Sequence, residues 1–112
     1  MTICEPGDVA IVPFPFTDMA VAKPRPALVL SAQGVNANSG HTVFAMITTA
    51  ARSHWPQDVP LQDAAAAGLR AESIVRGKLF TLDNRLISRT IGRISRRDRA
   101  AIRAVLKTLV AL

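Results

Sequence analysis

Short runs of apolar residues, separated by polar and turn-forming residues, follow one another along most of the chain. They are rich in Val, Ile and Phe and too short for ordinary helices, so they predict β-strands. Close spacing of short strands predicts a small, mostly antiparallel barrel. The expected strands cover residues 7–16, 26–31, 42–48, 58–61, 73–76, 79–82 and, with a weaker pattern, 90–94.

Proline and glycine mark where this strand pattern should be interrupted. Pro13 and Pro15 cannot donate to a ladder, which predicts an edge or a bulge at the far end of the first strand. Gly77 separates the fifth and sixth apolar runs. Residues 17–24 are expected to form a loop, and residues 34–40 a turn-rich connection.

The last segment has the periodicity of a helix. Ser95 is a good N-cap, and Asp98 follows at the capping-box spacing, with Asp in place of Glu. One expected helix face is apolar and should pack on the sheet or on a second subunit. Another face carries cations. The apolar stripe is Ile102, Val105, Leu106, Leu109 and Leu112, and the basic stripe is Arg96, Arg99, Arg103 and Lys107.

Composition fits this mostly β fold with a C-terminal helix. The chain has 112 residues, 49% of them hydrophobic and 20% charged, which predicts a single compact domain over residues 1–112. The single cysteine, Cys4, cannot form an internal disulfide and is expected to be a small buried or terminal residue. No signal-peptide pattern and no apolar run of about 20 residues is visible, so a cytoplasmic protein is expected.

The net charge of +6 is unevenly distributed. Residues 1–56 hold three cations and three anions, whereas residues 57–112 hold eleven cations and five anions. This asymmetry suggests a polyanionic partner, either nucleic acid or an acidic protein. A basic face that only aids solubility is the alternative.

Arg25 is the strongest candidate for chemistry. It ends the first loop and lies between Pro24 and Pro26, which restrict the backbone around it. A guanidinium held at the mouth of a strand is suited to gripping a phosphate or a developing negative charge. Thr48 and Thr49 end the third strand, where their hydroxyls could donate to phosphate oxygens.

Further cations and one aromatic residue follow these candidates. Arg52, His54 and Trp55 share one loop, and Arg76 and Lys78 end a later strand. Such a set suits single-stranded RNA, whose bases stack on rings while its backbone meets cations. Each residue also has an ordinary interpretation: His54 and Arg76 as surface residues, and Trp55 as a packing anchor of its loop.

Metal chemistry is not expected. The eight carboxylates are scattered, no cluster has ligand spacing, and no glycine-rich phosphate loop occurs. If the protein cleaves RNA, the 2′-hydroxyl should attack the adjacent phosphorus while Arg25 and Thr48 align and stabilise the reacting groups. Arginine is a poor general base, so the group that removes the 2′-hydroxyl proton is not identified.

The segments 7–18 (GDVAIVPFPFTD) and 25–30 (RPALVL) resemble the MazF/PemK family of toxin endoribonucleases from bacterial toxin–antitoxin systems. Further matches at residues 46–48, 72–76 and 79–83, together with the closing helix, extend the resemblance over nearly the whole chain. It implies an SH3-like barrel of the MazF/CcdB type and a homodimer. It also implies metal-independent, sequence-specific cleavage of single-stranded RNA, expected to be mRNA, that leaves a 2′,3′-cyclic phosphate. No cofactor is implied, and an acidic cognate antitoxin would act as inhibitor.

The resemblance places the family's catalytic arginine at Arg25 and its catalytic threonine at Thr48. Residues 17–24 correspond to the loop that borders the family's active site. Some relatives carry an acidic residue shortly after the arginine equivalent to Arg76, but residues 76–79 here read RGKL, so no acid–base role is assigned there. The residues expected to contact RNA are Asp18, Lys23, Thr49, Arg52, His54, Arg76 and Lys78.

Two other functions stay open at this point. The related CcdB toxins resemble this family in fold but poison DNA gyrase without cleaving RNA. Arg25 followed by proline, together with Thr48, disfavours that alternative. A module that binds RNA without cleaving it is the third hypothesis, motivated by the absent acidic residue after Arg76.

Overall fold

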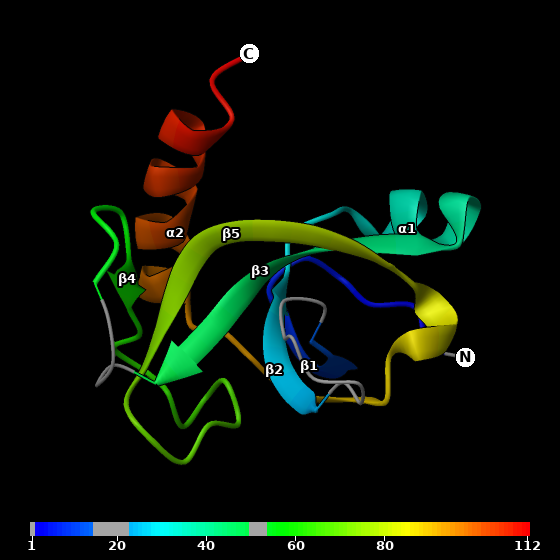
Figure 1. Cartoon of the computed structure of the whole chain (residues 1–112), viewed down its shortest axis with the longest axis horizontal. Coiled ribbons are helices and arrows are strands. Elements are labelled where there is room, and N and C mark those ends of the chain that lie inside the picture. The colour runs from blue at the N-terminus through cyan, green and yellow to red at the C-terminus, as the bar shows by residue number, and fades with distance from the viewer. Residues whose placement is uncertain (1, 15–22, 50–53) are drawn as a thin grey trace.

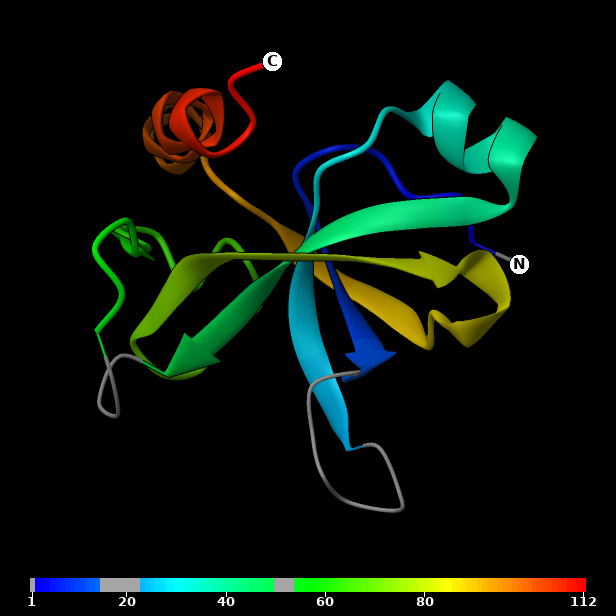
Figure 2. The same ribbon diagram turned by 45° about the horizontal axis from the view of Figure 1, so that its top comes forward.

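The computed structural model describes residues 2–14, 23–49 and 54–112, and its strands form one curled antiparallel sheet, a half-barrel (Figure 1). The strand order is β4-β5-β3-β2-β1-β6. Helix α2 lies beside β4 and β5, and α1 lies at the opposite side of the molecule in both views (Figure 2). The elements are β1 (Asp8–Pro13), β2 (Pro24–Val29), α1 (Gln33–Ser39), β3 (His41–Thr49), β4 (Val59–Pro60), β5 (Ser73–Asp83), a 3-10 turn (Asn84–Leu86), β6 (Arg89–Arg93) and α2 (Arg96–Leu109). The expected fold class is confirmed.

The sheet buries apolar side chains on both faces, because successive strand residues point in opposite directions. Leu28 of β2 belongs to the cluster that packs against Ile102 of α2, whereas its neighbour Val29 belongs to the opposite cluster. In the opposite cluster the ring of Phe80 stacks on Phe44, with centroids 5.5 Å apart, and meets Phe14 edge-on at 5.8 Å. The strand expected over residues 26–31 is therefore covered on both faces.

The two edge strands, β4 and β6, are bridged by the turn segment 64–68. The Arg93 N–H on β6 donates to the Ala66 carbonyl at 3.1 Å. Gly92 permits this contact, because a Cβ there would lie 2.4 Å from the Ala67 carbonyl carbon and 2.6 Å from the Gly68 nitrogen. The turn consists of alanines and a glycine, whose side chains are small or absent. Its backbone can therefore lie directly against the backbone of β6.

Helix α2 begins at the expected N-cap, but Asp98 has a different partner from the one expected. The Asp98 N–H donates to the Ser95 hydroxyl at 3.3 Å, which confirms the cap. The buried Asp98 carboxylate accepts from the backbone N–H groups of Gln62 and Asp63 at 2.8 and 2.9 Å. It therefore ties the helix to the turn that bridges the sheet edges. Leu112 lies beyond the end of the helix and is exposed, so it does not belong to the packed stripe.

The connection expected over residues 34–40 is in fact the short helix α1. Its buried Asn36 explains the difference, since the side-chain amide donates to the carbonyls of Cys4 and Ser31 at 2.9 and 3.1 Å. Gly40 ends the helix with φ +72°. Tertiary hydrogen bonds therefore hold a segment whose composition is typical of turns.

The two strands expected on either side of Gly77 form one strand, β5. Ala45 of β3 pairs with Leu79, and the next residue, Met46, pairs with Arg76. Gly77 and Lys78 are thus a bulge rather than a break, because a bulge inserts residues without ending the strand.

The interruption expected at the proline end of β1 is present. Pro13 pairs with Pro24 of β2, whereas the pairing with β6 covers only residues 8–11. Pro15 and residues 17–22 of the expected loop lie outside the described residues. No helix in the described part of the chain is long and apolar enough to cross a membrane.

Candidate active site

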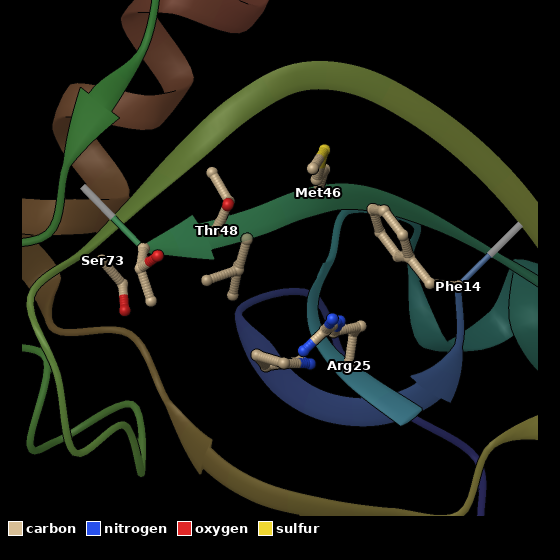
Figure 3. A pocket seen from close by; sticks show the side chains of 8 residues that line it. Phe14, Arg25, Met46, Thr48 and Ser73 are labelled. Atoms are coloured by element: carbon tan, nitrogen blue, oxygen red, sulfur yellow. The ribbon is translucent and has the colours of Figure 1, made fainter. Parts of the chain in front are cut away.

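A pocket of about 460 Å³ opens where β2 begins and the antiparallel β3 ends (Figure 3). Arg25 comes from β2 and Thr48 from β3, with Ser73 towards one end of the pocket and Phe14 towards the other. The residues that line it are Phe14, Arg25, Pro26, Met46, Ile47, Thr48, Thr49 and Ser73. The structure therefore brings together Arg25, Thr48 and Thr49 as the sequence predicts.

Strand register explains why Arg25 and Thr48 share this pocket. Ala27 of β2 pairs with Met46 of antiparallel β3. Continuing this register by two residues brings Arg25 level with Thr48, and residues two apart on a strand share a face. The Arg25 side chain forms no ion pair with another described residue and is exposed. A cation and a hydroxyl thus face one pocket from neighbouring strands.

The structure places Arg76 in a setting that the sequence did not predict. Its side chain and that of Asp58 are 7% and 4% exposed and form a bidentate ion pair, with Nε–Oδ1 at 3.0 Å and Nη2–Oδ2 at 2.9 Å. These hydrogen bonds hold the pKa of the Asp58 carboxyl below its usual value and raise the pKa of Arg76. The guanidinium carbon lies 5.0 Å from the centroid of the Trp55 ring. Arg76 is therefore a buried cation whose charge is neutralised by Asp58, and it is not a surface cation.

Comparison with known proteins identifies the family. The sequence model for the PemK-like, MazF-like toxins of type II toxin–antitoxin systems matches residues 5–110. This chain belongs to that family. A comparison with curated protein sequences gave no match.

Solved structures share the fold of this MazF-like toxin. A MazF from Deinococcus radiodurans (Form-I) is 21% identical with a TM-score of 0.77, and the alignment covers 100% of both chains. The Mycobacterium tuberculosis toxin MazF-mt6 is 24% identical with a TM-score of 0.74, covering 94% of this chain and 97% of that one. A mycobacterial endoribonuclease in complex with its cognate antitoxin is 17% identical with a TM-score of 0.76, covering 100% and 97%.

The lining of the pocket does not include Lys23, His54 or Lys78, which were also expected to contact RNA. Lys23 is exposed immediately before β2, and His54 is exposed in the segment before β4. The Lys78 ammonium lies 6.0 Å from the centroid of the Trp55 ring. Asp18 and Arg52 lie outside the described residues. Contact between any of these residues and RNA stays a prediction.

Sequence reasoning missed three features of the toxin's site. Phe14 and Ser73 line the pocket, and Asp58 neutralises Arg76. Ser73 lies opposite Thr49 in the β3–β5 ladder, a long-range pairing with no local signal in the sequence. The alternation of apolar residues around Phe14 could have placed it on the same sheet face as Arg25.

The pocket combines one cation, hydroxyl groups and apolar walls. The described residues that line it include no carboxylate and no imidazole, and in the same part of the chain no group of three or more His, Cys, Asp or Glu could hold a metal ion. Cys4 is fully buried, and its burial raises the pKa of the thiol, with a smaller contribution from Asp8. Among the described residues that line the pocket, only Arg25 carries a charge that could stabilise an anion, and the hydroxyls could orient its oxygens.

Proposed function

We propose that this protein is the toxin of a toxin–antitoxin pair and acts as a metal-independent endoribonuclease that cleaves single-stranded RNA at short specific sequences. The observation that carries the proposal is the pocket that Arg25 and Thr48 both line from the neighbouring strands β2 and β3. Membership of the PemK-like, MazF-like toxin family supports it, as does the name endoribonuclease borne by a mycobacterial protein of the same fold.

The proposed reaction is an internal transesterification. The 2′-oxygen of the RNA forms a bond to the adjacent phosphorus, and the bond from phosphorus to the 5′-oxygen breaks. The 2′-hydroxyl loses its proton, the leaving 5′-oxygen gains one, and the products are a 2′,3′-cyclic phosphate and a 5′-hydroxyl. Arg25 stabilises the charge that grows on the phosphorane oxygens, and the Thr48 hydroxyl donates to one of them. Within the described parts of the chain, Arg25 is the one ionisable residue that lines the pocket, so the base that accepts the 2′-hydroxyl proton is assigned to no residue.

We further propose that a single toxin domain over residues 1–112 works as a homodimer in the cytoplasm and is inhibited by an acidic antitoxin. The net charge of +6, concentrated in residues 57–112, supports a polyanionic partner. RNA and an acidic antitoxin segment would then compete for one basic surface, so added salt should weaken both interactions steeply.

Incubation of purified protein with mixed-sequence RNA in EDTA tests the proposal. The wild type should cut at a few sites and leave cyclic phosphate ends, and Arg25→Ala should lose at least about 100-fold in rate while keeping its fold. Arg103→Ala, which removes an exposed cation from α2, is the matched control and should cut normally. A strict magnesium requirement would overturn the metal-free mechanism. Intact RNA together with stalled DNA gyrase would favour a CcdB-like poison instead.

A further inference from the structure

Trp55 is the single tryptophan of the chain, and its side chain is partly presented to solvent. The residue is 42% exposed, although large aromatic side chains are usually well covered. It lies between the end of β3 and the start of β4, so it follows the strand that carries Thr48. An exposed aromatic ring close to a candidate active site needs a structural or a binding explanation.

The Trp55 backbone is held in place by Asp58. The Trp55 N–H donates to the Asp58 carboxylate at 2.9 Å, and the Asp58 N–H donates to the Trp55 carbonyl at 3.1 Å. The same carboxylate grips the buried Arg76, whose guanidinium lies 5.0 Å from the ring centroid. The ring is therefore fixed before any ligand arrives, which reduces the ordering cost of binding on it.

Arg76, the cation beside the Trp55 ring, comes from the sheet face that carries the pocket, whereas the ring also borders Leu109 of α2. In the β3–β5 ladder Met46 pairs with Arg76 and Thr48 pairs with Ile74. Directly paired residues share a face, so Arg76 lies on the same face as Thr48 and beside Met46, which lines the pocket. Met46 and Thr48 are two residues apart, or about 7 Å along the strand.

The surroundings of the ring fit a nucleobase on a phosphate backbone. Trp55 borders a hollow of about 280 Å³ together with Pro56, Gln57, Gly77 and Leu109. These residues offer apolar surface and one amide that could pair with a base edge. The Lys78 ammonium at 6.0 Å from the ring centroid adds positive charge beside it.

We propose that Trp55 is a stacking platform for one unpaired base of RNA bound across the Arg25–Thr48 pocket. The proposal rests on the proposed function and adds a subsite to it. Aromatic rings accept bases of any identity, while the hollow beside the ring and the Gln57 amide would restrict which base fits. Trp55 then contributes to affinity and to the choice of cleavage sequence.

Tryptophan fluorescence tests the proposal directly, because Trp55 is the only tryptophan and the chain has no tyrosine. The probe is a mixed-sequence single-stranded RNA with 2′-O-methyl sugars, which lacks the attacking hydroxyl. Its binding should quench the fluorescence in a saturable, salt-sensitive manner. Trp55→Leu, which keeps an apolar cover over Arg76, should weaken binding about 5- to 150-fold, whereas Trp55→Phe should keep most of the affinity. Leu86→Ala, which trims another exposed apolar side chain, should leave binding unchanged.

The outcomes separate this proposal from the proposed function. Binding that leaves the fluorescence unquenched would overturn the stacking role without recourse to any variant. So would normal binding and cleavage by Trp55→Leu, the result expected if the ring meets a protein partner instead. Quenching and weakened Trp55→Leu binding without any cleavage of unmodified RNA would uphold the stacking role and overturn the endoribonuclease.

Discussion

Arg76 of β5 and Asp58 of the turn before β4 form a buried ion pair with two hydrogen bonds, at 3.0 and 2.9 Å. Asp58 also fixes the backbone of Trp55, so the pair joins this turn to the strand that lies beside β3. Arg76 therefore holds the turn that carries Trp55 against β5 through its buried partner. Direct contact with phosphate would require the guanidinium to be shared between Asp58 and the RNA.

Breaking this pair should destabilise the fold strongly. Arg76→Leu leaves the Asp58 carboxylate buried without its cation, and such a loss costs about 3–5 kcal/mol in the free energy of unfolding. Urea denaturation followed by circular dichroism measures the change. The matched control is Arg85→Leu, since the Arg85–Asp83 pair is also close, at 2.8 Å, but the Arg85 side chain is 78% exposed. Its loss should cost far less than the loss of Arg76, because water screens an exposed pair. Equal effects of the two substitutions would contradict a structural role for Arg76.

Acid should loosen the junction between the bridging turn and α2. Hydrogen bonds from Arg97 and then from the Ser95 hydroxyl lower the pKa of Asp63 from 3.8 to about 2. A carboxyl with a lowered folded-state pKa stabilises the fold above its unfolded pKa, and this stability is lost as the pH falls through the folded value. The contribution of Asp63 should therefore be complete above about pH 4 and disappear between about pH 4 and pH 2. Asp58, whose pKa is also lowered, acts in the same direction.

Melting temperatures recorded from pH 6 to pH 2 check this dependence. The wild type should melt at a steady temperature down to about pH 4 and at falling temperatures below it. Asp63→Asn cannot titrate, so its curve should fall less steeply in that window. A curve for Asp63→Asn parallel to that of the wild type would show that Asp63 has no lowered pKa.

Gly92 should tolerate no side chain. A Cβ at this position would lie under 3 Å from backbone atoms of Ala67 and Gly68. Backbone atoms cannot relieve such a clash by a rotamer change, as a flexible side chain can. Gly92→Ala should therefore push the bridging turn off β6 and lower the free energy of unfolding by at least about 2 kcal/mol. Gly34→Ala is the matched control, since nothing lies within 4 Å of its Cβ and α1 is helical there, so it should stabilise the protein by up to about 1 kcal/mol. Thermal melting that ranks the two variants in the opposite order would refute this account of the closure.

Much of this fold could be predicted from local pattern. Alternating and continuous apolar runs located all six strands, and Ser95 marked the start of α2, because these signals lie within a few residues of the elements they define. The helix α1 was missed because its decisive contacts join Asn36 to Cys4 and Ser31, outside the segment itself. The bulge at Gly77 was mistaken for a break because only the pairing with β3 shows that the strand continues.

The candidate site also combines residues that local sequence signals mark with residues whose role depends on long-range contacts. Arg25 and Thr48 were found because prolines and a strand end mark them in the sequence, and the β2–β3 register then brings them level. The burial of Arg76 could not be predicted, since its partner Asp58 lies 18 residues away with no periodic relation to it. Pairings of this kind depend on how the sheet curls, which is decided by packing over the whole chain rather than by local sequence.

The Thr48 hydroxyl should matter for cleavage and little for stability. In the part of the chain that the structure describes, the Thr48 hydroxyl makes no hydrogen bond. Thr48→Val therefore breaks no hydrogen bond between described residues and should change the free energy of unfolding little. If the hydroxyl donates to a phosphorane oxygen, Thr48→Val should lower kcat by about 100-fold and leave the melting temperature within a few degrees of the wild type. Thr48→Ser should keep most of the activity. Thr90→Val on β6 is the matched control, because it makes the same change on an exposed strand away from the pocket. Single-turnover cleavage of a fluorescent RNA gives the rates, and a Thr48→Val enzyme as fast as Thr90→Val would remove Thr48 from the catalytic machinery.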